Sequence, residues 1–175
     1  IQVNAAMNAA MIAAAIALLE VAPHERVLDL FCGLGNFSLA LARHAAQVLG
    51  VEGDAALVAR AQANARYNGL PNIEFRSADL FNEAAVAALW PPAGDRSLWH
   101  KLLLDPPRTG AVEVVKSIPD HGPRRIVYVS CNPATLARDA EILVHAKGYR
   151  LQSAGVMDMF PQTTHIESIA CFEKP

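Results

Sequence analysis

The run Val27-Leu28-Asp29-Leu30-Phe31-Cys32-Gly33-Leu34-Gly35-Asn36 decides the fold of this 175-residue chain. An apolar stretch leads into a loop with two glycines, and a helical pattern follows directly. The missing Cβ at Gly33 lets a ligand approach the backbone closely. The run therefore predicts a buried strand, a tight turn that faces a nucleotide, and a helix.

Apolar runs and helical stretches alternate along the rest of the chain. Strands are predicted at residues 27–31, 48–52, 73–77, 101–105 and 125–130, with a closing, antiparallel pair at 149–157 and 165–172. Helices are predicted at residues 36–43, 54–68 and 134–146. Asp54 and Gly69 suit the two ends of the second helix. The alternation predicts an α/β fold built on a largely parallel sheet.

The composition suits one domain over residues 1–175, because 53% of the residues are hydrophobic and can fill a core. The net charge is -2 and the pI is near 6.3, whereas a chain that binds nucleic acid by charge alone is strongly basic. Residues 5–19 are apolar but fall short of the roughly 20 residues that cross a bilayer. We expect a core helix there, no membrane contact, and an excised piece of a longer protein.

The three cysteines are widely spaced and form neither a CxxC motif nor a Cys/His cluster. This pattern argues against a disulfide framework and against a metal site, and it indicates a reducing cytoplasm. Cys32 and Cys171 are interpreted as packing residues. Trp90 and Trp99 are interpreted in the same way, in preference to base stacking.

Three acidic residues and one serine indicate what kind of nucleotide the loop would accept. Glu52 ends the second strand, where a carboxylate accepts hydrogen bonds from both hydroxyls of a ribose, in NAD or in S-adenosylmethionine. Ser38 replaces the third glycine of a dinucleotide motif, which disfavours a pyrophosphate. Asp29 suits a ligand with a cationic amino acid group, and Asp79 suits an adenine amino group. The alternative for both aspartates is to cap or pin a loop.

The segment Asp105-Pro106-Pro107-Arg108 ends the fourth strand with a carboxylate and a stiff wall of two prolines. It is similar to the Asp-Pro-Pro-Tyr signature of enzymes that methylate amines. Arg108 stands where those enzymes have an aromatic residue that stacks on the base. Methylation of an exocyclic amine is therefore disfavoured, and a rigid loop without a ligand is the alternative.

Cys131 follows the fifth strand and precedes a helix, in Ser130-Cys131-Asn132-Pro133. The helix N-terminus is expected to lower the pKa of the thiol and favour thiolate, although inert packing is the alternative. A thiolate that adds to carbon 6 of uracil makes carbon 5 nucleophilic enough to accept a methyl group. A base must then remove the proton from carbon 5. Glu167 is the first candidate, against an exposed strand-end carboxylate, and His165 is a candidate orienting residue or RNA contact.

Taken in order, these motifs resemble those of the RNA 5-methyluridine methyltransferase family. The resemblance rests on Gln2-Val3-Asn4, the Gly-Leu-Gly-Asn loop, Glu52, Asp-Pro-Pro-Arg, Ser-Cys-Asn-Pro and the ending His-Ile-Glu. It covers the whole chain, and it is closest to the bacterial members that methylate uridine 1939 of 23S ribosomal RNA, over residues 26–36, 48–53, 126–131 and 157–160.

The resemblance implies a Rossmann-like class I fold that depends on S-adenosylmethionine, with about seven strands, mostly parallel, and an antiparallel C-terminal strand. It implies Cys131 as nucleophile and Glu167 as base, with no metal. Together with Gly33 of the loop, the expected cofactor residues are Gln2, Phe31, Gly33, Asn36, Glu52, Asp79 and Asp105.

The family resemblance also implies RNA as the partner of this chain, with 23S ribosomal RNA as the first candidate. Members typically carry an N-terminal TRAM domain and a central domain that often holds an iron–sulfur cluster, and neither is represented in this sequence. We therefore expect weak RNA affinity for the fragment, a monomer, and no protein partner. The alternatives are a uridine in transfer RNA or another ribosomal RNA site, a truncated module that binds the cofactor without activity, and, least favoured, a dinucleotide oxidoreductase.

Overall fold

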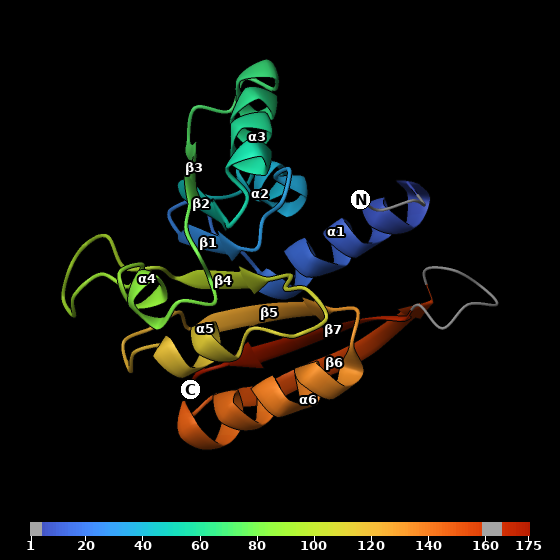
Figure 1. Cartoon of the computed structure of the whole chain (residues 1–175), viewed down its shortest axis with the longest axis vertical. Coiled ribbons are helices and arrows are strands. Elements are labelled where there is room, and N and C mark those ends of the chain that lie inside the picture. Colours follow the sequence, from blue (N-terminus) through green and yellow to red (C-terminus); the bar gives the residue numbers. More distant parts are fainter. Residues whose placement is uncertain (1–4, 159–165) are drawn as a thin grey trace.

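A computed structural model describes residues 5–158 and 166–175. These residues form a seven-stranded sheet in the order β3-β2-β1-β4-β5-β7-β6, with helices against both faces (Figure 1). Strands β1 to β5 are parallel, and β7 runs antiparallel to both of its neighbours. The predicted fold class is confirmed, including the antiparallel strand at the C-terminal end.

The strands lie within one or two residues of their predicted positions. They are β1 Arg26–Leu30, β2 Gln47–Glu52, β3 Ile73–Ser77, β4 Lys101–Leu104, β5 Arg125–Ser130, β6 Arg150–Asp158 and β7 Ile166–Glu173. Strands of a parallel sheet that helices cover on both faces read as nearly continuous apolar runs, which explains why the sequence showed β1, β2, β4 and β5 clearly.

The helices are α1 Ala5–Leu19, α2 Asn36–Leu41, α3 Ala55–Tyr67, α4 Glu83–Ala87, α5 Val112–Ser117 and α6 Pro133–Glu141, followed by a π-helical turn η1 Ile142–Ala146. The Asp54 carboxylate caps α3 as predicted, accepting from the amides of Ala56 and Leu57. Two predictions are wrong in extent. Helix α2 ends at Leu41 and not at 43, and residues 134–146 are not one regular α-helix, since Lys147 N–H bonds back to the Ile142 carbonyl.

The sheet separates two apolar cores. In β5, Val127 and Val129 face the core that α1, α2 and α3 cover, whereas Ile126 and Tyr128 face the core under α4, α5 and η1. Cys32 and Cys171 are buried in the first core, and Trp99 in the second, with Trp90 packed against it. The interpretation of these four as packing residues is confirmed. Within the described ranges, no helix is long and apolar enough to span a bilayer.

The strand order places a topological switch between β1 and β4. From β1 the chain continues to β2 and β3 on one side, and it then crosses to β4 and β5 on the other (Figure 1). Open α/β sheets bind ligands at the carboxyl ends of the strands beside such a switch. The loops that follow β1 to β5 carry most of the predicted site residues.

Candidate active site

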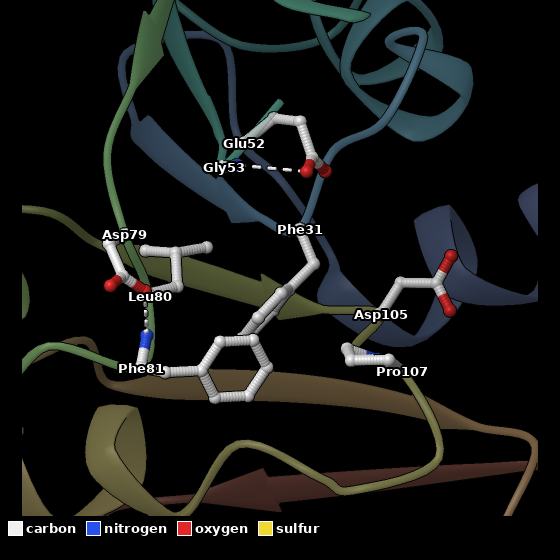
Figure 2. Close-up of a pocket in the computed structure, with 8 residues that line it drawn as sticks. All are labelled: Phe31, Glu52, Gly53, Asp79, Leu80, Phe81, Asp105 and Pro107. Carbon is white, nitrogen blue, oxygen red and sulfur yellow. Dashed lines mark hydrogen bonds between the residues drawn. The ribbon is translucent and has the colours of Figure 1, made fainter. Parts of the chain in front are cut away.

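A pocket of about 310 Å³ lies at this carboxyl edge. The loops after β1, β2, β3 and β4 all contribute to it, through Phe31, Glu52, Gly53, Asp79, Leu80, Phe81, Asp105 and Pro107 (Figure 2). Four of the seven predicted cofactor residues are therefore neighbours in space: Phe31, Glu52, Asp79 and Asp105.

The Glu52 carboxylate is held in place by backbone amides. Oε2 accepts from Gly33 N at 3.0 Å, and Oε1 accepts from Gly53 N at 2.8 Å and from Asp54 N at 3.2 Å. A carboxylate held at the end of β2 in this way is orientated to accept further hydrogen bonds from two vicinal hydroxyls. Gly33 thus acts through its amide, and the space beside its Cα is open within 4 Å.

Two aromatic rings form the middle of the pocket wall. Phe31 adopts a positive φ of 64°, a conformation that costs a non-glycine residue about 1–2 kcal/mol. Its ring lies 5.7 Å from the ring of Phe81, tilted by 55°, and Figure 2 shows both between Asp79 and Asp105. Strained backbone at a ligand site is typical of residues that position a contact group. Phe81 is about half exposed, which leaves ring surface available to a flat ligand.

Asp29 lies beneath this edge and is fully buried. Its Oδ2 accepts a hydrogen bond from the Ser38 hydroxyl, and its Oδ1 has no partner in the described part of the chain. Burial raises the pKa of Asp29 to about 7, the Ser38 hydrogen bond opposes the rise, and the Glu52 charge adds to it. Ser38 is therefore a partner of Asp29, which explains a serine where a dinucleotide fold has glycine.

Asp105 follows β4 and shares this environment. Burial raises its pKa to about 7, and the negative charges of Asp29 and Glu167 add to the rise. Two carboxyl groups with elevated pKa values at one strand edge favour a cationic ligand, because a positive charge would relieve their repulsion.

The strand register brings the predicted nucleophile and base together. Strand β5 pairs with β7 from Arg125 opposite Glu173 to Ser130 opposite Ser168. Cys131 directly follows Ser130, and Glu167 directly precedes Ser168 in β7, so both residues are adjacent in sequence to this last pair. Their charges interact, because Glu167 raises the pKa of the Cys131 thiol, and Cys131 is half-buried, so the thiol remains reachable.

The expected lowering of the Cys131 pKa is wrong. Burial raises the pKa of the thiol first, and the carboxylates of Glu167 and Asp105 raise it further. The Arg108 charge and a local backbone hydrogen bond act in the opposite direction but are outweighed. The helix N-terminus alone therefore does not generate a thiolate.

Not every predicted residue joins the pocket. The Asn36 amide exchanges two hydrogen bonds with Asn8 of α1, at 2.7 and 3.1 Å, and is absent from the pocket lining. Its cofactor role stays a prediction. Gln2 and His165 lie outside the described residues. No cluster of His, Cys, Asp and Glu that could hold a metal ion occurs in the ranges that the structure covers.

Sequence reasoning missed three pocket residues, Gly53, Leu80 and Phe81, whereas Pro107 belongs to the predicted wall of prolines. Phe81 was detectable in principle, since Asp79-Leu80-Phe81 puts an aromatic directly after a strand-end carboxylate. Asp79 Oδ1 accepts from Phe81 N at 2.9 Å, and this short turn directs the ring toward Phe31.

The arrangement suits a nucleoside that carries a cationic group. Glu52 offers acceptors for hydroxyls, Phe31 and Phe81 offer flat apolar surface, and Asp105 offers a carboxyl group, whereas the Asp29 carboxyl is fully buried and does not line the pocket. A thiol and a carboxylate lie beside it at the ends of β5 and β7.

Comparison with known proteins agrees with this geometry. A family model described as tRNA (Uracil-5-)-methyltransferase matches residues 1–174. The 23S rRNA (uracil(1939)-C(5))-methyltransferase RlmD of Thiobacillus denitrificans is 58% identical over 99% of this chain, and the protein of the same description from Azoarcus sp. is 59% identical over 99%. The chain spans 39% and 40% of the length of these two relatives.

Among solved structures, the tRNA (uracil-54, C5)-methyltransferase of Pyrococcus abyssi, in complex with S-adenosyl-L-homocysteine, superimposes with a TM-score of 0.78. It is 29% identical, and the match covers 98% of this chain and 39% of that one. TrmN from Thermus thermophilus, at 22% identity and a TM-score of 0.73 over 94% of this chain and 48% of that one, shares the fold.

Proposed function

Since the chain belongs to the tRNA (uracil-5-)-methyltransferase family, we propose that it is the catalytic domain of an enzyme that methylates carbon 5 of a uridine in RNA. The donor is S-adenosylmethionine, and the preferred substrate is 23S ribosomal RNA at uridine 1939, the specificity named for the relatives at 58% and 59% identity. The observation that supports the proposal is the β5–β7 pairing, whose last pair, Ser130 opposite Ser168, is adjacent in sequence to Cys131 and to Glu167, at the strand edge that carries the pocket.

The pocket residues fit this donor. Glu52 would bind the ribose hydroxyls and Asp79 the adenine amino group, while Phe31 and Phe81 pack on the adenosine. Asp105, with Asp29 behind it, would offset the positive charges of the methionine portion; burial raises the pKa of Asp105 first, and the donor would relieve the repulsion from Asp29 and Glu167 that raises it further. When bound, S-adenosylmethionine supplies an electrophilic methyl group at a sulfonium.

Cys131 and Glu167 carry out the steps on the base. The Cys131 thiolate adds to carbon 6 of uracil, and the electron pair of the C5–C6 double bond moves toward carbon 5 and the carbonyl at carbon 4. Once carbon 5 has taken the methyl group, the Glu167 carboxylate removes the remaining proton from it. The released pair restores the double bond and expels the thiolate from carbon 6.

The raised pKa of Cys131 is consistent with a sequence in which the donor binds first and the thiolate forms afterwards. With burial and two carboxylates around it, the thiol stays protonated in the free chain and resists oxidation or alkylation. A cationic donor beside Asp105 offsets one of the opposing charges. The thiolate is therefore favoured when the donor is present.

The rest of the protein supplies what this domain lacks. The chain spans about two fifths of its relatives' length, and its charge of -2 provides little attraction for RNA. We propose a cytoplasmic, monomeric enzyme in which segments outside these residues bind the RNA and this domain performs the chemistry.

The test of the function is methyl transfer by the full-length protein. Tritiated S-adenosylmethionine should label 23S ribosomal RNA from cells that lack the enzyme, with the label at uridine 1939, and should leave transfer RNA unlabelled. Labelling of transfer RNA instead would move the substrate to the alternative class. Donor binding in calorimetry without any RNA labelling would reduce the chain to a binding module.

A further inference from the structure

The loop after β4 is fastened to the start of α6. The Arg108 carbonyl accepts from Asn132 Nδ2 at 2.9 Å and from Thr135 Oγ1 at 3.2 Å, and the Thr109 carbonyl accepts from Arg138 Nη2 at 2.9 Å. Three side chains spaced along α6, from its N-cap Asn132 to Arg138 in its last turn, thus hold two consecutive carbonyls of the loop. The segment 105–111, which we call the proline loop, cannot move independently of α6.

Asp139 is the buried anchor of this contact. It has no exposed surface, and its Oδ2 accepts from the Tyr128 hydroxyl at 2.6 Å and from Ala111 N at 2.7 Å. Its Oδ1 accepts from Arg138 Nε at 2.9 Å. One carboxylate therefore ties together β5, α6 and the far end of the proline loop.

The fit at the anchor leaves no spare space. A Cβ at Gly110 would lie 2.6 Å from Arg138 Nη2 and 2.7 Å from Asp139 Oδ2, and Gly110 has a φ of +79°. The backbone of the proline loop packs directly on the ion pair, so a shift of Asp139 would shift the loop.

The proline loop carries two charges that act on the nucleophile. Arg108 lowers the pKa of Cys131, whereas Asp105 from the same loop and Glu167 from β7 raise it, together with burial. Of the three charged residues that shift the pKa of Cys131, Arg108 carries the positive charge. Its carbonyl accepts a hydrogen bond from Asn132, the residue that follows the nucleophile, so the position of the Arg108 backbone relative to Cys131 depends on this contact.

We propose that Asp139 is a positioning residue for Cys131: it fixes the proline loop on α6 and thereby holds Arg108, whose carbonyl is bonded to the residue after Cys131, near the thiol. The inference rests on the proposed role of Cys131 as nucleophile. In this arrangement Asp139 touches neither the donor nor the RNA, and its effect passes through Arg108.

The test measures the Cys131 thiol directly, without RNA. In the full-length protein, alkylation of Cys131 by iodoacetamide is followed against pH by mass spectrometry of its peptide, which separates it from the buried Cys32 and Cys171. The variants are Asp139→Asn, Arg108→Gln and their combination. Arg124→Gln is the matched control, because it removes the same charge just before β5 begins, far from Cys131.

Arg108→Gln should move the midpoint of the pH profile upward and slow alkylation at neutral pH roughly two- to fivefold, the effect of one partly screened charge near a thiol. Asp139→Asn should also move the midpoint upward. The side-chain amide has one acceptor oxygen, so it cannot accept from both Arg138 and the pair formed by Tyr128 and Ala111, and its N–H₂ group would face one of these donors. The double variant should show no further change beyond Arg108→Gln, and the control should match the wild type.

Additive effects in the double variant, or an Asp139→Asn profile identical to that of the wild type, would overturn the proposal. If Asp139→Asn does not fold, Tyr128→Phe decides, since it deletes one hydrogen bond to Asp139 and keeps the ring. It should shift the midpoint upward by a smaller amount, and an unchanged profile overturns the proposal. Failure of the methylation assay in the wild type would refute the proposed function instead, because alkylation does not depend on that activity.

Discussion

Replacing Asp29 by asparagine should stabilise the unliganded chain at high pH and lose that advantage on acidification. Asp29 is fully buried, and burial raises its pKa from 3.8 to about 7. Above pH 7 the carboxylate is charged in both the folded and the unfolded state, and the folded state bears the full cost of burying it. Below pH 7 the folded state takes up a proton that the unfolded state does not bind until about pH 3.8.

The size of the effect follows from the two pKa values. Between pH 8 and pH 5, protonation of Asp29 in the folded state stabilises the wild type by about 2 to 3 kcal/mol, at about 1.4 kcal/mol for each pH unit below 7. Asparagine has no such dependence, although its N–H₂ replaces the unpartnered Oδ1 and costs about 1–3 kcal/mol at every pH. The difference in unfolding free energy between variant and wild type should therefore fall by about 2 to 3 kcal/mol from pH 8 to pH 5.

Urea unfolding of both chains at the two pH values measures this difference. With a slope of about 2 kcal/mol/M, the separation of the midpoints should change by about 1 M. Asp120→Asn, on an exposed loop, is the control and should follow the wild type at both pH values. If the difference in unfolding free energy between variant and wild type is the same at pH 8 and pH 5, Asp29 does not have a raised pKa in the folded state, and the reasoning is refuted.

Three further predictions concern other parts of the site. Glu52→Ala should weaken binding of S-adenosylmethionine by roughly 10- to 100-fold in calorimetry, the effect of losing hydrogen bonds to a charged group. The control, Glu74→Ala at an exposed position of β3, should bind with the affinity of the wild type. Equal affinities for the two variants would show that Glu52 does not bind the donor. Glu167→Gln should accumulate a covalent complex with unmodified RNA on denaturing gels, since the proton at carbon 5 stays in place, and rapid turnover would exclude Glu167 as base. Gly50→Ala should lower the urea stability by about 1–3 kcal/mol, because its Cβ would lie 2.6 Å from Phe75 Cδ1; an unchanged midpoint would show that the ring moves freely.

The sequence could predict the sheet and its functional edge because both depend on short, strong patterns. The buried strands are apolar runs with carboxylates at their ends: Glu52 is the last residue of β2, Asp79 lies two residues after β3, and Asp105 directly follows β4. Parallel strands end at the same edge, so residues distant in sequence could be expected together. Helices α4 and α5 were missed because five or six residues are too few to show a helical period.

Other features depended on packing that no local pattern reveals. Phe81 enters the pocket only because β3 and β1 lie on either side of β2. Asp139 binds both the Tyr128 hydroxyl of β5 and the amide of Ala111, which lies 28 residues before it in the sequence. The direction of the Cys131 pKa was missed for the same reason. A helix N-terminus is local and visible, whereas Glu167 arrives from β7 and burial comes from the whole fold.

The covalent step is tested most directly by trapping with RNA that carries 5-fluorouridine at the target position. Fluorine at carbon 5 cannot be removed as a proton, so the adduct between Cys131 and carbon 6 should persist after methyl transfer. We predict a species of the combined mass of protein, RNA and one methyl group for the wild type, and none for Cys131→Ala. A stable adduct with Cys131→Ala would contradict the assignment of Cys131 as the nucleophile.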